Sequence, residues 1–317
     1  MPSYLFKRVS MALFSVLLVT SLTFSLLSLM PGNTAVVIIQ EVLGGGIGYV
    51  PTASEIAKVR EMYSLNEPLY LRYVHWLGNA LRGNFGISYV TGMPVSDEIW
   101  TRLKTTIILA TISGILTIIF ATAAGLYSAS KRGYVQDKVL TFFSGLFVSI
   151  PEFLLGLILM LVFSLKINLF PVSGWGSPAH MVLPALTLAM GRMAFTTRIV
   201  RASALDVMEK EYITTARAKG LKENYILTHH VLKNALIPVM PYMGLEIGSL
   251  LSGSMIVGTL FSIPGLGQLL VNSITARDMP VIQACAAVIA LMYATVNILA
   301  DVFTRILDPR IRFGGQK

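Results

Sequence analysis

The chain has 317 residues, of which 54% are hydrophobic and only 13% are charged, and its mean hydropathy is +0.70. Soluble domains carry about 25% charged residues, so this composition excludes a soluble enzyme or regulator, which would lack the polar surface to cover itself. The formal net charge is +9, and the single cysteine, Cys285, excludes a disulfide within the chain.

Six apolar stretches follow one another along the chain. Each is near or above the ~18 residues that a transmembrane segment needs, and backbone amides in lipid must be paired within the segment, so we expect helices. The first is longer than the apolar region of a signal peptide, which predicts a permanent span. The six are Val9–Met30, Ile107–Ala129, Val139–Leu165, Met181–Val200, Leu236–Phe261 and Val281–Phe303.

The basic residues predict the orientation of these spans. Fifteen lysines and arginines lie in the two tails and in the links after the second and fourth stretches, against two in the links after the third and fifth. Short cytoplasmic links carry this excess, so we expect both termini on the cytoplasmic side. The charge of +9 is then an orientation signal, and binding to nucleic acid is not needed to explain it.

The first long connection, segment 31–104, is expected outside the cytoplasm. Thr52 and Glu55 fit a capping box at the start of a helix that should reach about Tyr63. Pro68 favours the start of a second helix, which should end before Gly83. We expect a small cap packed on the membrane domain, and docking of an extracytoplasmic partner on this cap is compatible with that interpretation.

The second long connection, residues 202–235, is charged and is expected in the cytoplasm. Ser203 fits the start of a helix, Gly220 fits a left-handed stop, and a second helix should return the chain to the membrane. The pattern predicts a helix–glycine–helix hairpin, either as a protein-docking element or as a solvated connection. The predicted organisation is a tail with the first transmembrane helix (1–30), an extracytoplasmic segment with short helices (31–104) and a five-helix membrane core (105–317).

Motifs for catalysis and for ATP binding are absent from the sequence. There is no G-x-x-x-x-G-K-[ST] loop, no H-E-x-x-H and no G-x-S-x-G. The neighbouring His229 and His230 would diverge by about 100° on a helix, so we expect exposed imidazoles and no metal site. The sequence predicts no catalytic, cofactor-binding or metal-binding residue in this chain.

Three ionisable residues, Glu152, Arg192 and Glu246, lie near the middle of predicted spans. A charge at the bilayer centre costs at least about 2.5 to 3.5 kcal/mol, so each must face protein or water. One interpretation is a translocation path in which Arg192 meets a substrate carboxylate and a glutamate meets an ammonium. The other is an internal salt bridge between Arg192 and one of the glutamates. Pro151 should kink its helix beside Glu152.

The residues from Glu211 to Leu221, EYITTARAKGL, resemble the signature of binding-protein-dependent ABC importer permeases, most closely the dipeptide, oligopeptide and nickel branch. Other stretches that resemble this branch occur in order along the chain. One departure is Gly258, where the family often has a glutamate, so no charged role is expected there. The other stretches are 65–69 (LNEPL), 83–86 (GNFG), 261–267 (FSIPGLG), 277–283 (RDMPVIQ) and 307–312 (LDPRIR).

This resemblance implies an all-α membrane protein with six transmembrane helices and type I ABC importer permease architecture. It further implies a second homologous permease chain, two cytoplasmic ATPase subunits that bind the ATP and magnesium, and an extracytoplasmic substrate-binding protein. It places the chain in the cytoplasmic (inner) membrane of a bacterium or archaeon. The ATPase-coupling residues that it implies are Glu211, Tyr212, Thr214, Thr215, Ala216, Arg217, Ala218, Lys219, Gly220 and Leu221.

The substrate is left open by these signatures. Di- or oligopeptides are the leading prediction, and nickel, metal–opine chelates or glutathione are alternatives within the same architecture. A secondary transporter would also explain six spans and mid-span charges, although it would leave the charged hairpin unexplained.

Overall fold

The computed structural model describes residues 2–29, 33–41 and 49–307. Within these ranges the regular structure is helical, with one isolated β-bridge between Ile87 and Pro94. The all-α prediction is therefore confirmed. The chain divides into two compact units, Met1–Thr106 with Pro264–Ala294 and Ile107–Ile263 with Thr295–Lys317. The predicted division into 1–30, 31–104 and 105–317 concerns placement across a membrane, so it stays a prediction.

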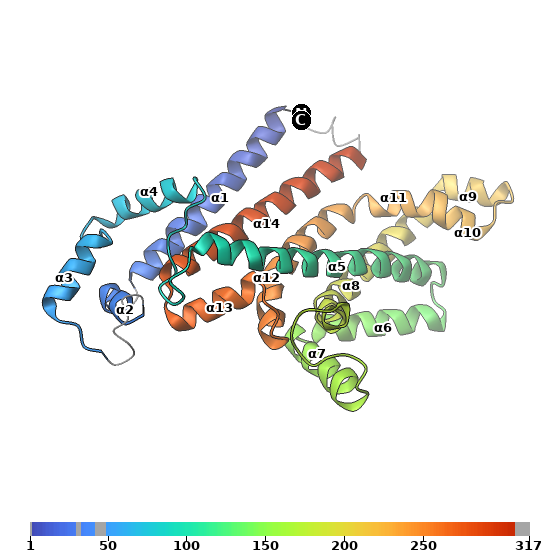
Figure 1. Ribbon diagram of the computed structural model, residues 1–317. Helices are drawn as coiled ribbons and strands as arrows, with labels where there is room; N and C mark the ends of the chain where they lie inside the picture. Colours follow the sequence, from blue (N-terminus) through green and yellow to red (C-terminus); the bar gives the residue numbers. More distant parts are fainter. Residues whose placement is uncertain (1, 30–32, 42–48, 308–317) are drawn as a thin grey trace. The chain divides into compact units, whose positions relative to one another are not determined.

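The first unit contains four helices before the long helix α5 and two helices near the end of the chain (Figure 1). Thr52 accepts from the amide of Glu55, and the Glu55 carboxylate accepts from the amide of Thr52, as the capping box predicts. The helices are α1 (Pro2–Ser28), α2 (Thr34–Glu41), α3 (Ala53–Met62), α4 (Leu69–Ala80), the start of α5 (Val95–Ser130), α13 (Leu266–Ala276) and most of α14 (Met279–Leu307).

The second unit is built around α8 (Pro178–Met208), which packs against α6, α7, α11 and α12. Helix α5 also approaches α8 closely. A small residue permits this approach, since a Cβ on Gly125 of α5 would lie 2.7 Å from the Val200 side chain of α8. The other elements are α6 (Val135–Ser149), α7 (Glu152–Leu159), the π-helix η1 (Met160–Lys166), α9 (Glu211–Ala218), α10 (Glu223–Tyr225), the π-helix η2 (Ile226–Val231), α11 (Leu232–Leu236) and α12 (Met240–Leu260).

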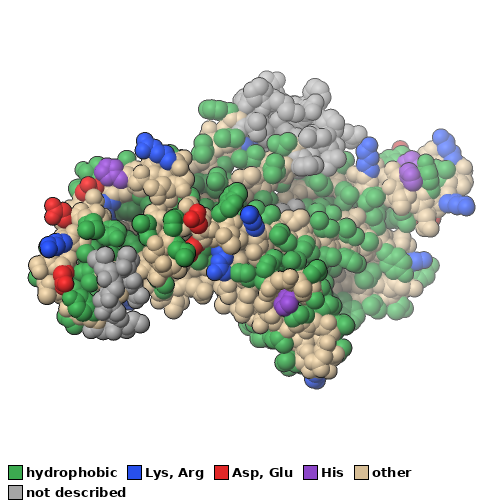
Figure 2. Space-filling model, in the orientation of Figure 1, with side chains coloured by type: hydrophobic (Ala, Val, Ile, Leu, Met, Phe, Trp, Pro, Cys, Tyr) green, Lys and Arg blue, Asp and Glu red, His purple; other side chains and the backbone are tan. Residues whose placement is uncertain are grey.

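Four of the described helices are long and apolar enough to cross a bilayer, and a fifth candidate is the bent pair α6–α7 with η1. Hydrophobic side chains cover much of the visible surface in Figure 2, as lipid-facing helices require. The predicted span Met181–Val200 lies inside α8, which contains Arg192 and Arg198 there and is not among these candidates. The count of six spans and the side of each terminus therefore stay predictions.

A proline divides the predicted span Val139–Leu165 into two helices. Ile150 is extended (φ −82°, ψ 125°), as a residue before proline prefers, and Pro151 forms the N-cap of α7. The axes of α6 and of the segment after Pro151 differ in direction by 108°. The predicted kink is confirmed, and at Pro151 it amounts to a break between two helices.

Candidate functional site

A compact hairpin of short helices lies between α8 and α12. The predicted helix start at Ser203 is wrong, because α8 continues to Met208 and the break falls at Lys210, whose backbone is extended. The Ser203 hydroxyl instead donates to the carbonyl oxygen of Ala235 at 2.8 Å and thereby closes the base of the hairpin. Gly220 has φ +78°, so the predicted left-handed stop is confirmed. We call α9, Gly220, α10, η2 and α11 the Gly220 hairpin.

The Gly220 hairpin shares an apolar core with the ends of α5 and α8 and keeps a separate exposed face. Ile213 and Ala216 of α9 are buried against Ile226 and Val231 of η2. This spacing of three residues gives α9 one buried stripe. The other nine predicted coupling residues are exposed, including Tyr212 and Arg217. The structure therefore presents most of the signature to the outside, and Ala216 alone of the ten lies in the core.

An ion pair joins the two arms of the Gly220 hairpin. Arg217 donates from Nη2 to Oε1 of Glu223 at 2.7 Å and from Nε to Oε2 at 3.2 Å. This bidentate geometry is specific to arginine. The Arg217 guanidinium holds the pKa of the Glu223 carboxyl below its usual range, and the carboxylate raises the pKa of Arg217. The turn at Gly220 is therefore fixed by a contact that spans it.

A second ion pair fixes α8 shortly before it leads into the Gly220 hairpin. The buried Asp137 carboxylate, at the start of α6, accepts two bonds from Arg201 of α8, at 2.6 and 2.7 Å. It also accepts from the Ser128 hydroxyl of α5 and from the amide of Gly133. Three helices therefore meet at one carboxylate, which we call the Asp137 clamp.

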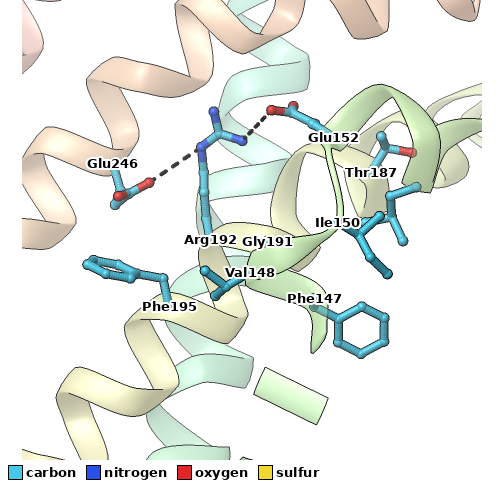
Figure 3. Close-up of a pocket in the computed structure, with 10 residues that line it drawn as sticks. Phe147, Val148, Ile150, Glu152, Thr187, Gly191, Arg192, Phe195 and Glu246 are labelled. Atoms are coloured by element: carbon cyan, nitrogen blue, oxygen red, sulfur yellow. Dashed lines mark ion pairs between the residues drawn. The ribbon is translucent and has the colours of Figure 1, made fainter. Parts of the chain in front are cut away.

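The three mid-span charges meet in the second unit. Arg192 of α8 lies between Glu152 of α7 and Glu246 of α12, as Figure 3 shows. Nη1 of Arg192 is 3.3 Å from Oε2 of Glu152, and Nε is 3.5 Å from Oε2 of Glu246. The salt bridge that the sequence left as one of two alternatives is present in the structure, and it includes both glutamates.

This ion cluster lines a cavity of about 290 Å³. Aromatic and aliphatic side chains form the rest of the wall, and the main chain at Ile150 passes beside it, where α6 ends (Figure 3). The bend at Pro151 thus places the first residue of α7 at the cavity. The lining residues are Phe147, Val148, Ile150, Glu152, Leu155, Thr187, Gly191, Arg192, Phe195 and Glu246.

The described residues contain no group of three or more His, Cys, Asp or Glu side chains able to hold a metal ion. His229 is exposed and stacks on Tyr225 with ring centroids 4.1 Å apart, whereas His230 is half-buried. The expected exposure is therefore confirmed for His229 and wrong for His230.

Two interactions in the second unit have little or no signal in the sequence. Asp137 and Arg201 are 64 residues apart, and Arg201 was interpreted only as one of the basic residues that mark the cytoplasmic side. Ser249, three residues after Glu246, holds the Arg192 guanidinium through its hydroxyl and its carbonyl. The only sequence signal for the contact between Asp137 and Arg201 is their position. Asp137 comes just before the predicted span Val139–Leu165, and Arg201 comes just after the next span, Met181–Val200.

Apolar helices around a charged cavity, with a packed hairpin beside them, define a class of protein, the multi-pass membrane permease. The chain matches the family described as "Binding-protein-dependent transport system inner membrane component" over residues 121–313 and the N-terminal part of such membrane components over residues 1–110. The chain belongs to this family of permeases.

Two curated relatives extend over almost the whole chain. The glutathione transport system permease protein GsiC of Escherichia coli (strain K12) is 37% identical over 313 residues, covering 99% of this chain and 100% of that protein. The oligopeptide transport system permease protein AppB of Bacillus subtilis (strain 168) is 38% identical over 327 residues, with the same coverage. Both similarities therefore cover nearly all of this chain and the whole of each relative.

A solved structure supports the fold. An inward-facing conformation of the MetNI methionine ABC transporter matches with a TM-score of 0.58 at 16% identity, over 67% of this chain and 96% of that chain. The protein has the type I ABC importer permease fold. It is a transporter subunit in the cytoplasmic membrane, not an enzyme, and the secondary transporter considered from the sequence is not supported by this family.

Proposed function

We propose that this chain is one permease subunit of an ATP-driven importer of di- or oligopeptides, which an extracytoplasmic binding protein delivers. The observation that carries the proposal is the exposed signature face of α9 on a hairpin that is packed against the ends of α5 and α8 and closed by Arg217 and Glu223. The names of two relatives, which specify oligopeptides and glutathione, favour peptides as the substrate class.

The Gly220 hairpin is the ATPase-coupling element in this proposal. Nine exposed residues of the signature would contact a cytoplasmic ATPase subunit, and the buried Ala216 would hold α9 on the hairpin core. Because α8 leads directly to Lys210 and α9, movement of the ATPase would reach α8. Two ATPase subunits would bind the ATP and magnesium, since this sequence has no P-loop.

The charged cavity is part of the translocation path in this proposal. Glu152, Arg192 and Glu246 lie on three different helices, so relative movement of these helices would change the cavity. A second homologous permease chain would complete the path. Glutathione, itself a tripeptide, is the alternative substrate within the same class, and nickel or metal–opine chelates remain further alternatives.

The test is reconstitution of the complex in proteoliposomes with its binding protein. Tagged permease should copurify with an ATPase that carries a P-loop, and uptake of labelled peptide should require ATP. Glu152→Gln and Arg192→Gln complexes, matched for expression, should take up peptide more slowly. Normal uptake by both variants would remove the cavity from the path, and binding of nickel chelates in place of peptides by the binding protein would change the substrate class.

A further inference from the structure

The cavity at Arg192 contains more acidic than basic groups. Two carboxylates, of Glu152 and Glu246, face one guanidinium, so with both carboxylates ionised the formal charge of the cluster is −1. Glu152 is the first residue of α7, where the partial positive charge of a helix N-terminus favours a carboxylate. One negative charge is therefore left without a counter-ion among the residues of this cluster.

Arg192 is already occupied by the protein. Its Nη1 donates to the carbonyl oxygen of Leu188 at 2.6 Å, its Nη2 to the carbonyl oxygen of Ser249 at 3.2 Å and its Nε to the Ser249 hydroxyl at 3.1 Å. All three nitrogens of the guanidinium thus have partners in addition to the two glutamates. A bidentate substrate carboxylate would therefore compete with contacts that the protein already makes.

The carboxylates are less completely satisfied than Arg192. Oε1 of Glu152 is buried and has no hydrogen-bond partner among the described residues. Leaving such an oxygen unpaired is unfavourable, and a small rotation of the Glu152 side chain would offer this oxygen to a donor in the cavity. The side chain is 29% exposed, more than the 13% of Arg192. Among the described residues that line this cavity, the buried side-chain atom without a hydrogen-bond partner is therefore an acceptor.

The remainder of the wall suits a small organic cation. Phe147 and Phe195 line the cavity together with aliphatic side chains (Figure 3), and aromatic faces attract ammonium and guanidinium groups. The volume of about 290 Å³ is close to the lower limit of small-molecule sites, about 300 Å³. It fits one amino-acid-sized group of a substrate and not a whole oligopeptide.

We propose that this cavity is a cation-selective subsite, in which Glu152 and Glu246 receive a positively charged group of the peptide while Arg192 positions the two carboxylates. This inference rests on the proposed function and specifies it further. It replaces the earlier interpretation in which Arg192 receives a substrate carboxylate, because every nitrogen of Arg192 already contacts Leu188, Ser249 or a glutamate.

The experiment compares peptides that differ only in one positive charge. Reconstituted complex is supplied with binding protein saturated with a tripeptide that has lysine or its neutral analogue norleucine at the central position, or with a tripeptide whose amino terminus is free or acetylated. Initial uptake rates give the ratio of cationic to neutral peptide. Wild-type and variant complexes share one binding protein, so its own preference cancels when their ratios are compared.

Glu152→Gln and Glu246→Gln should each reduce the ratio of cationic to neutral uptake by about tenfold, the size expected for loss of one charged hydrogen bond. Glu61→Gln, which removes an exposed glutamate of α3 far from this cavity in the sequence, should leave the ratio unchanged. Amidation of the peptide carboxyl terminus should change uptake equally in wild-type and Arg192→Gln complexes, because Arg192 does not bind that terminus.

The outcomes separate this inference from the proposed function. If the wild-type complex takes up no peptide, the proposed function fails. If it takes up peptide but both glutamine variants keep the wild-type ratio, the subsite is wrong and the proposed function stands. An Arg192→Gln defect that is confined to peptides with a free carboxyl terminus also overturns it. Where one glutamine variant does not assemble, a wild-type ratio in the other glutamine variant overturns it.

Discussion

Arg201 of α8 donates two hydrogen bonds to the buried carboxylate of Asp137. Arg201 lies nine residues before Lys210, where the chain breaks between α8 and the Gly220 hairpin. The Asp137 side chain is 6% exposed and that of Arg201 is 27% exposed. Removing one partner of a buried ion pair leaves the other charge uncompensated, which typically destabilises a protein by about 3 to 5 kcal/mol.

The first prediction concerns this clamp. Arg201→Ala should destabilise the second unit by about 3 to 5 kcal/mol and lower the melting temperature of the purified complex, followed by fluorescence in detergent. Arg132→Ala is the matched control, because Arg132 pairs with Glu209 on the surface with both side chains more than 60% exposed, and such pairs contribute little. Equal melting temperatures for Arg201→Ala and wild type would contradict the prediction.

The second prediction separates strain at Gly220 from its position on the proposed coupling element. Gly220 (φ +78°) and Gly83 (φ +81°) have the same left-handed backbone and open space around a new Cβ. Alanine at either site costs roughly 1 to 2 kcal/mol in this conformation, so the two variants should be similarly stable. Gly220→Ala should nonetheless lower peptide uptake per ATP hydrolysed, and Gly220→Arg should abolish it, while Gly83→Ala keeps the wild-type ratio.

The third prediction concerns the contact between α5 and α8. A Cβ on Gly125 would meet Val200 Cβ at 2.7 Å and the carbonyl oxygen of Thr197 at 2.9 Å, and overpacking of this kind costs about 1 to 3 kcal/mol. Gly125→Ala should therefore reduce the yield of monodisperse complex in gel filtration. Gly145→Ala on α6 has nothing within 4 Å of the new carbon and should give the wild-type yield.

The fourth prediction is a pH dependence in the Gly220 hairpin. Arg217 holds the pKa of Glu223 below its ordinary value of 4.5. Since the folded-state pKa is depressed, the stabilisation is complete above about pH 4.5 and is lost as the pH falls through the folded-state pKa. Hydrogen exchange of residues 211–225, corrected for intrinsic rates, should be slower in wild type than in Glu223→Gln at pH 6. The two should converge towards pH 3, and a difference that persists there would refute the pair as its source.

The fifth prediction concerns Asp278 in the first unit. This buried carboxylate accepts from the Ser88 hydroxyl at 2.5 Å and from the amides of Tyr89 and Val90 at 3.1 and 3.4 Å. Asn in its place would turn one acceptor oxygen into a donor, so Asp278→Asn should speed hydrogen exchange of residues 88–92. Asp97→Asn, a change at an exposed residue in the first turn of α5, should leave that exchange unchanged.

Local features were predictable from the sequence because their chemistry depends on neighbours along the chain. The capping box at Thr52, the kink at Pro151 and the left-handed Gly220 each follow from one residue type and its spacing. The approach of Arg192 to a glutamate was predictable as an alternative, because a charge within a span needs a partner. The resemblance at 307–312 lies mostly outside the described residues.

Contacts over long separations were not predictable. Asp137 meets Arg201, and Ser88 meets Asp278 across 190 residues, and the helix packing that brings them together leaves no periodic signal in one sequence. The same limit explains the error at Ser203. Its hydroxyl could cap a helix, but apolar contacts around Ala204 and Val207 extend α8 past it, and burial outweighs the preference of one capping residue.

Helix α8 connects three features: Arg192 in the cavity, Arg201 in the Asp137 clamp and the start of the Gly220 hairpin. From Arg192 to Met208 helix α8 contains neither proline nor glycine, and 16 helical steps make a lever of about 24 Å. Such a helix resists shortening and bending, so a displacement that reaches its end at Met208 would arrive at Arg192 as tilt or twist of the whole segment. The timing of substrate release would then depend on the stiffness of this one helix. A proline substitution between Phe195 and Arg198 should uncouple ATP hydrolysis from peptide uptake, although it changes neither the Gly220 hairpin nor the charged residues of the cavity.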